Sequence, residues 1–253
     1  MSSIGQVTEI YPRADPAGIP LGLRVDRQVT ALRMGAPEAG PGLGRQARAV
    51  FGRMRELVER AGGGLENIAK VTAYVSSAQE RGPVNGTWWE EVFPDPGDKP
   101  AYKVLVAPLP AGRLIELDVL AVLGGTRRRI DVPGVPARDP TVGIGGMVFT
   151  SRVHGTVPFT GDQVAEGGAR GQAAQAFRNV LTLVTLAGGS PGDILQLTSF
   201  GRDPDYAEPV REALDAMFPG EATRPPLVTL TNFIPAKFEV MVEMTAVIGG
   251  KDS

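Results

Sequence analysis

The sequence repeats itself at a spacing of 126 residues, and this repeat limits the possible folds more than any other feature. The apolar positions of one predicted helix recur, one for one, in a second helix later in the chain. They are Ala47, Val50, Phe51, Met54, Leu57, Val58 and Ala61, matched by Ala173, Ala176, Phe177, Val180, Leu183, Val184 and Ala187. Spacings of three and four residues give each helix one buried face. The chain is therefore two copies of one unit.

Each copy predicts the same order of elements, β-β-α-β-α-β-β. Besides the long helices, the predicted elements are 21–25, 28–33, 68–75, 84–92, 102–107 and 114–122, then 141–144, 148–152, 194–200, 210–217, 227–231 and 238–247. Gly-Gly follows each long helix, as a left-handed C-cap requires. The spacing falls to 125 between Phe93 and Phe218, which indicates one residue fewer in the second short helix.

The domain prediction is two units, 1–125 and 126–253, because single domains typically run to about 100 to 150 residues. The run Arg127-Arg128-Arg129, followed by Pro133 and Pro136, lies at the junction between them. Three arginines at a domain junction are more often a solvated connector than a nucleic-acid patch. We therefore interpret this run as a connector.

Composition excludes several classes of function. The formal charge is −2, so no basic excess is present for nucleic acid. The absence of cysteine and the presence of one histidine exclude disulfides, thiolate chemistry and multi-histidine metal sites. No stretch approaches the ~20 apolar residues of a membrane span, and the first residues lack a signal-peptide pattern. We expect no cofactor, no metal, no nucleic-acid or membrane partner, and a cytoplasmic location.

Several motifs resemble those of the Rid family, also called YjgF-like, which are small enamine and imine deaminases. They are Ala61-Gly62-Gly63 before a Thr-bearing strand, Val84-Asn85 opening the short helix, and Leu109-Pro110 before the run Leu114 to Ala121. The resemblance implies an α+β fold of two chorismate-mutase-like units, each a curved mixed sheet with two helices on one face. It also implies a homo-oligomer, with a trimer favoured, and active sites between subunits.

The resemblance assigns catalysis mainly to the first copy. Glu116, six residues after Pro110, matches the glutamate that holds the attacking water in the family. The family's substrate-binding arginine is missing, because its position holds Ala101 or Tyr102. In the second copy Met241 stands where the glutamate belongs, and Pro226 or Leu227 where the arginine belongs. Glu243 corresponds to Asp118 instead, so the second copy is degenerate.

The predicted site combines these positions with neighbouring polar and aromatic residues. Glu116 and Tyr102 are the candidate catalytic residues. The candidate substrate-binding residues are Arg33, Asn85, Trp88, Lys103, Ser151, Arg152, His154 and Arg224. Structural alternatives stay open: a salt bridge from Glu116 to Arg113 or Lys103, packing for Tyr102 and one of the tryptophans, a helix cap for Asn85, and a structural role for His154 and Arg33.

Three functions remain open at this point. The first is an enzyme that acts on an enamine, imine or related unsaturated carbonyl compound by carboxylate-assisted proton transfer or hydration. Loss of the family arginine favours a substrate larger and less acidic than a 2-imino acid. The second is a cyclase or dehydratase that forms a ring in a specialised biosynthetic pathway. The third is a non-catalytic metabolite-binding protein. RNA cleavage, attributed to some relatives, is disfavoured by the acidic balance.

Overall fold

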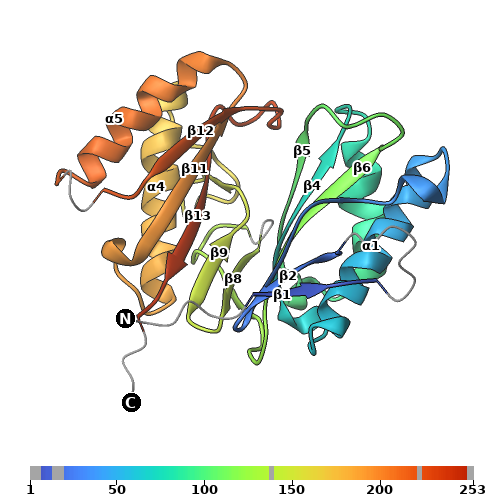
Figure 1. Cartoon of the computed structure of the whole chain (residues 1–253). Helices are drawn as coiled ribbons and strands as arrows, with labels where there is room; N and C mark the ends of the chain where they lie inside the picture. Colours follow the sequence, from blue (N-terminus) through green and yellow to red (C-terminus); the bar gives the residue numbers. More distant parts are fainter. Residues whose placement is uncertain (1–6, 13–19, 137–139, 221–223, 250–253) are drawn as a thin grey trace. The chain divides into compact units, whose positions relative to one another are not determined.

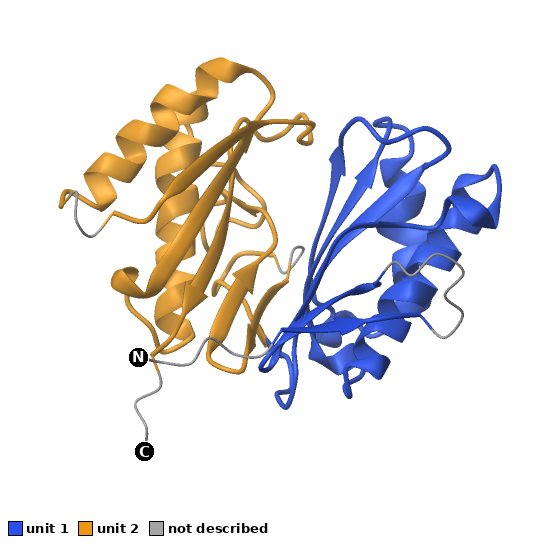
Figure 2. Ribbon diagram, viewed as in Figure 1, with its two compact units in different colours: residues 1–128 blue, residues 129–253 orange. Residues whose placement is uncertain are grey.

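The chain forms two compact units, residues 1–128 and 129–253 (Figure 2). The computed structural model describes residues 7–12, 20–136, 140–220 and 224–249. The boundary lies after Arg128, later than the boundary expected after residue 125, because Arg127 is buried in the first unit. Its guanidinium donates to the carbonyl oxygens of Ile68 at 2.8 Å and Asp98 at 2.9 Å. The interpretation of the arginine run as a solvated connector is therefore wrong for Arg127.

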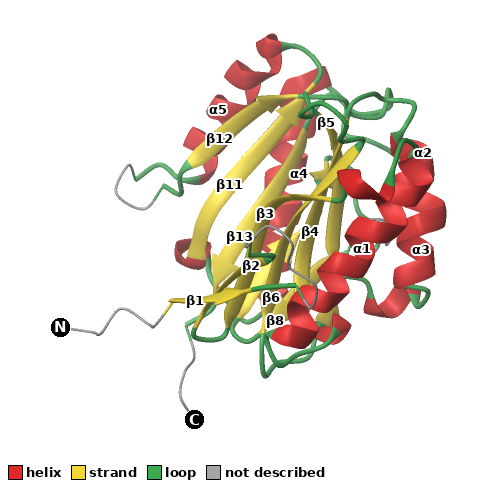
Figure 3. Cartoon of the chain, turned by 45° about the vertical axis from the view of Figure 1, so that its right-hand side comes forward, coloured by secondary structure: helices red, strands yellow, loops and turns green. Residues whose placement is uncertain are grey.

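Unit 1 is a six-stranded mixed sheet with its helices on one face (Figures 1 and 3). The strands are β1 Val7–Ile10, β2 Gly22–Val25, β3 Gln28–Gly35, β4 Ile68–Val75, β5 Ala101–Val106 and β6 Ile115–Val122. Their spatial order is β1-β2-β3-β6-β4-β5. β4 and β5 run parallel, and β6 inserts between β3 and β4 with antiparallel pairing to both. The helices are α1 Leu43–Arg60 and a composite short helix from α2 Arg81–Pro83 through η3 Val84–Trp88 to α3 Trp89–Val92.

Unit 2 repeats this plan in a seven-stranded sheet. Its strands are β7 Arg128–Ile130, β8 Thr141–Ile144, β9 Met147–Thr150, β10 Val153–His154, β11 Ile194–Gly201, β12 Leu227–Thr231 and β13 Met241–Val247. The order is β12-β11-β13-β9-β8-β7, and β10 pairs with β13. The helices are α4 Gly168–Leu186 and α5 Ala207–Met217. Short 3-10 turns are η1 Pro37–Ala39, η2 Leu65–Asn67, η4 Pro96–Asp98, η5 Pro191–Asp193 and η6 Pro204–Tyr206. The fold is α+β, as predicted.

Both long helices end in the same backbone motif. In α1 the Gly62 N–H donates to Glu59 O at 3.0 Å, and the Gly63 N–H donates to Val58 O at 2.8 Å. Gly62 and its counterpart Gly188 have φ of +88° and +92°, a conformation that glycine adopts without steric cost. Gly188 and Gly189 make the same two bonds in α4. This crossed pair of bonds is a Schellman motif, so the left-handed C-caps are confirmed.

The one-residue step in the repeat has a structural cause. The short helix of unit 1 contains a π turn at Val84–Trp88, whereas α5 is an uninterrupted α-helix. A π turn accommodates one extra residue without ending the helix. The helix also begins at Arg81, so Asn85 lies inside it, exposed, and not at its start. The prediction of Asn85 as a helix cap is wrong.

Successive side chains along each strand point to opposite faces of the sheet, which separates the core from a polar face. In unit 1 one set of side chains, including Val71, Leu117 and Val119, packs in the core that includes the residues of α1. The other set projects to the helix-free face of the sheet. Register places Glu116 opposite Tyr74 on this face, and Thr72 between Asp118 and Lys103. The two faces of unit 1 therefore differ in chemistry.

Candidate functional site

Glu116 lies on the helix-free face of unit 1 between two arginines. Its side chain is 1% exposed, while those of Arg33 and Arg113 are 39% and 35% exposed. Oε1 accepts a hydrogen bond from Arg113 Nη1 at 2.6 Å. Oε2 forms an ion pair with Arg33 Nε but makes no aligned hydrogen bond in the described structure. We name this group the Arg33–Glu116–Arg113 cluster. The salt bridge to Arg113 is confirmed, and Arg33 is a second partner.

Arg33 is held in an unusual backbone conformation. Its φ is +53°, a region that costs energy for residues other than glycine. The backbone N–H of Arg33 donates to Asp118 Oδ1 at 2.7 Å, and Tyr74 Oη donates to Asp118 Oδ2 at 2.6 Å. The guanidinium carbon lies 4.3 Å from the centre of the Tyr74 ring, and Nη2 donates to Pro108 O at 3.1 Å. These contacts fix the direction of the Arg33 side chain toward Glu116.

The cluster presents positive charge outward over a buried carboxylate. Both arginines use part of their donor set on Glu116 and on backbone carbonyls, and each is about one-third exposed. A guanidinium carries five N–H donors, so each retains donors for another acceptor. The arrangement can therefore bind an anionic group directly above Glu116.

Unit 2 keeps the arginine and loses the carboxylate. The strand register places Arg152 at the position equivalent to Arg33. Arg152 donates to Phe233 O at 3.1 Å and lies 5.9 Å from the Phe200 ring, as Arg33 does with the equivalent carbonyl and ring. Met241 pairs with Phe200 just as Glu116 pairs with Tyr74. The degenerate second copy predicted from the sequence thus has an arginine beside an apolar wall.

The structure does not bring Tyr102 and Glu116 together. Tyr102 lies in the helix-side core, where its ring stacks on Trp89 with centroids 3.7 Å apart. Its hydroxyl donates to Val84 O at 3.2 Å, and burial raises its pKa above the usual value. Trp89 is buried with Phe51 and Phe93 around it, so this member of the tryptophan pair is a packing residue.

We expect Tyr102→Phe to leave turnover unchanged within about twofold, because the hydroxyl faces the core. The lost hydrogen bond should lower the free energy of unfolding of unit 1 by about 1 kcal/mol. Steady-state kinetics and urea unfolding measure the two effects. A turnover loss of about tenfold or more would restore Tyr102 as a catalytic candidate.

The other predicted residues of unit 1 divide between the two faces. Lys103 is buried and shares the helix-free face with Glu116, one strand beyond Thr72. Asn85 and Trp88 belong to the short helix, on the opposite side of the sheet. Of these three, only Lys103 therefore extends the polar face that carries the cluster.

The predicted residues of unit 2 have structural partners. His154 is buried, with Nδ1 2.7 Å from Thr156 Oγ1 and its ring stacked on Phe238 at 4.5 Å. Ser151 is also buried, next to Arg152 in the loop after β9. Arg224 forms an ion pair with Asp215 of α5 at 2.8 Å, so it is directed toward that helix. Of these, Arg152 alone occupies a position equivalent to a member of the cluster.

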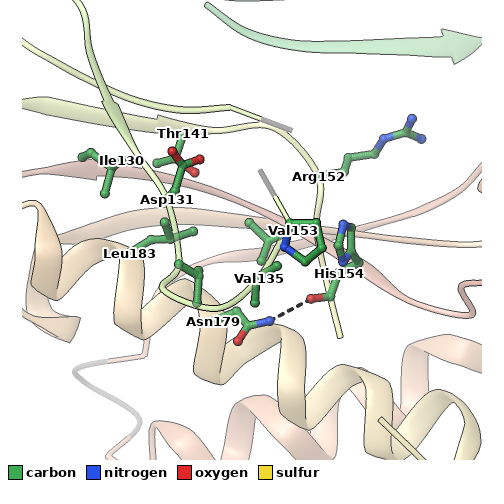
Figure 4. Close-up of a pocket in the computed structure, with 11 residues that line it drawn as sticks. Ile130, Asp131, Val135, Thr141, Arg152, Val153, His154, Asn179 and Leu183 are labelled. Atoms are coloured by element: carbon green, nitrogen blue, oxygen red, sulfur yellow. Dashed lines mark hydrogen bonds between the residues drawn. The ribbon is translucent and has the colours of Figure 1, made fainter. Parts of the chain in front are cut away.

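A small cavity of about 40 Å³ adjoins His154 (Figure 4). Asn179 closes one side and donates to the carbonyl oxygens of His154 at 3.0 Å and Thr156 at 2.9 Å. Arg152 is directed away from Asn179 in this view (Figure 4). A volume of this size holds two or three water molecules. It is too small for a metabolite.

A larger open hollow of about 540 Å³ lies elsewhere in unit 2. Its polar lining includes Asp203, Asp205 and Glu239 beside Arg202, whose guanidinium donates to Ala236 O at 3.1 Å.

Within the described ranges no group of three acidic or histidine side chains could hold a metal ion. No helix among the described residues is long and apolar enough to cross a membrane.

Comparisons with known proteins agree with this architecture. The model of a family described as endoribonuclease L-PSP matches residues 35–123 and 138–248, one segment in each copy. A chorismatase structure is 20% identical, covers 89% of this chain and 76% of that chain, and has a TM-score of 0.63. Its likeness shows the fold across both copies.

Single-copy proteins match about half of the chain. RidA from the Antarctic bacterium Psychrobacter sp. is 25% identical, covers 48% of this chain and 100% of that chain, and has a TM-score of 0.44. A putative endoribonuclease from Thermotoga maritima is 23% identical, covers 49% and 98%, and has a TM-score of 0.43. No curated protein sequence matches the chain.

Proposed function

Because the chain belongs to the endoribonuclease L-PSP family, also called the Rid or YjgF family, we propose that it is a small-molecule enzyme whose reaction site is the Arg33–Glu116–Arg113 cluster. The observation that carries this proposal is a carboxylate, 1% exposed, beneath two partly exposed guanidiniums. The substrate class is a carboxylated enamine, imine or related unsaturated carbonyl compound.

The two arginines favour an acidic substrate. The missing family arginine predicts a substrate larger and less acidic than a 2-imino acid. Arg33 and Arg113 come from other positions and lie beside Glu116. Guanidinium forks bind carboxylates through paired, charge-assisted hydrogen bonds. A substrate carboxylate on these two side chains would bring its unsaturated carbon above Glu116.

Glu116 then supplies the proton transfer. Oε1 of Glu116 is held by the hydrogen bond from Arg113, and Oε2 is held by the ion pair with Arg33. A substrate anion that draws the two arginines away would free the Glu116 carboxylate to take a proton from water. In imine hydrolysis, Glu116 takes a proton from water as the water oxygen bonds to the C=N carbon, and it returns that proton to the nitrogen, which gives a carbinolamine. The hydroxyl proton of the carbinolamine then passes to the nitrogen as the C–N bond breaks, which releases ammonia and leaves a ketone.

Two other functions compete with hydrolysis. The same proton transfers would serve a cyclase or dehydratase that acts on an unsaturated carboxylate. The pairing of Glu116 with two arginines favours the other alternative, a non-catalytic binder, because both carboxylate oxygens are already occupied by ion pairs. Ammonia release from a panel of freshly generated imines and enamines tests the proposal. Ammonia release that the folded protein accelerates above the spontaneous hydrolysis of the same compound supports it, and no acceleration for any member contradicts hydrolysis.

Arg33→Ala and Arg113→Ala should each raise KM for a carboxylated substrate by about tenfold, because each removes a charge-assisted contact. An uncharged amide analogue of the same substrate serves as the control and should show little change in KM. Equal effects on acid and amide would argue against carboxylate binding at the cluster. The trimeric assembly that the resemblance implies stays a prediction, as does the cytoplasmic location expected from the sequence.

A further inference from the structure

A second hollow lies on the helical side of unit 1, away from the cluster. It has a volume of about 220 Å³ and is lined by Arg48, Phe51, Gly52, Arg55, Trp88, Glu91 and Val92. The lining comes from α1 and from the short helix, which lie side by side (Figure 3). Glu116 projects from the other face of the sheet, so this hollow is separate from the proposed reaction site.

Gly52 lines the hollow and places no side chain in it. Glycine inside a helix is less favourable than alanine, and a Cβ added at Gly52 would meet no atom within 4 Å. Close packing therefore does not require glycine here. The second copy has Arg178 at this position, 126 residues later. The hollow is thus a feature of the first copy.

The π turn brings a tryptophan to the hollow. The extra residue of the first copy is accommodated within Val84–Trp88, and π turns are frequent at functional sites. Trp88 is half-buried, and a Cβ added at Gly44 of α1 would lie 3.0 Å from its indole Cζ2. Trp89, in contrast, is buried in the core. The Trp88 indole therefore lies beside α1 and forms one side of the hollow.

Two arginines give the hollow a net positive lining. Arg48 and Arg55 are separated by two helical turns and lie on one side of α1. Arg48 donates two long hydrogen bonds to Glu91, from Nε at 3.4 Å and from Nη2 at 3.5 Å. Arg55 is exposed. The second copy has Ala174 and Leu181 at these two positions. Glu91 is the one acidic residue that lines the hollow, so the lining residues carry a net positive charge.

We propose that this hollow binds a small aromatic carboxylate. The ring would lie against the Trp88 indole, and the carboxylate would bind Arg55 and Arg48. The aromatic ring would stack on an aromatic side chain, and the carboxylate would accept charge-assisted hydrogen bonds from the arginines. The volume suits one ring, since pockets for larger ligands start at about 300 Å³.

Calorimetric titration of the full chain with benzoate tests this inference. We expect saturable binding of benzoate at one site in unit 1. Benzamide should bind the wild type at least about tenfold more weakly, and benzoate should bind the Arg55→Glu variant at least about tenfold more weakly. Gly52→Leu should abolish binding, because its side chain fills the hollow. Gly82→Leu is the matched control: Gly82 also faces open space, but it does not line the hollow, so binding should persist.

Arg113→Ala separates this site from the cluster. Benzoate binding that survives Arg113→Ala and disappears in Gly52→Leu supports the hollow, whatever the fate of the proposed activity. Binding lost in Arg113→Ala and kept in Gly52→Leu would overturn the inference, as would equal affinity for benzamide. No benzoate binding to the wild type would overturn it as well.

Discussion

Glu116→Gln is expected to lower turnover by about 10² to 10⁴-fold on any substrate that the wild type converts, because it removes the group that moves the proton. Glutamine has the size of glutamate and can still accept a hydrogen bond from Arg113, so the fold should persist. Initial rates of ammonia release or substrate loss, with KM and kcat measured separately, check this result. The drop should appear mainly in kcat.

Glu243→Gln is the matched control in the second copy. Glu243 is also buried on a β13 position facing away from the helices, but it pairs with Thr198 as Asp118 pairs with Thr72. Turnover should therefore stay within about twofold of wild type. If Glu243→Gln abolished turnover and Glu116→Gln did not, the reaction site would belong to unit 2.

Arg127→Ala should lower the free energy of unfolding of unit 1 by about 3 kcal/mol. Arg127 donates to the Leu65 carbonyl and, at 2.8 Å, to the Ile68 carbonyl. It also binds Asp98 through Nε and Nη2, at 3.0 Å and 2.9 Å. Alanine leaves these acceptors without their donor, and an unsatisfied buried group costs about 1 to 3 kcal/mol.

Both tryptophans, Trp88 and Trp89, lie in unit 1, so urea unfolding followed by tryptophan fluorescence reports on that unit. Arg128→Ala is the control from the same arginine run, because Arg128 belongs to unit 1 and is exposed. A surface substitution of this kind changes the free energy of unfolding by about 0.5 kcal/mol or less. Equal destabilisation by the two variants would contradict the role assigned to Arg127.

The repeat in the sequence predicted most of the architecture. Apolar spacing fixed the buried faces of α1 and α4, because any other rotation of these helices would expose Phe51 or Phe177. Gly62 and Gly188 predicted the helix ends. The drop in spacing from 126 to 125 located the insertion that became a π turn at Val84–Trp88.

The candidate site could be predicted only in part. The resemblance to the Rid family predicts Glu116, six residues after Pro110, as a site residue, and a salt bridge to Arg113 or Lys103 is one of its structural alternatives. The strand order was not available from the pattern: β5 and β6 follow each other in the chain, but β4 lies between them. The register places Tyr102 beside Val71 and Glu116 beside Tyr74, so the two side chains project from opposite faces. A register difference of one residue reverses a side chain's face, and local sequence does not reveal it.

The sequence by itself determined that two copies of one α+β unit are present, where their helices run and which copy has the glutamate. Periodicity and glycine positions act over a few residues, so they can be read locally. Only the tertiary structure decided that Arg33 reaches Glu116, which lies far from it in the sequence, and that Arg127 is buried. Such contacts depend on strand pairing and on a positive φ at Arg33, which arise only when the whole sheet assembles.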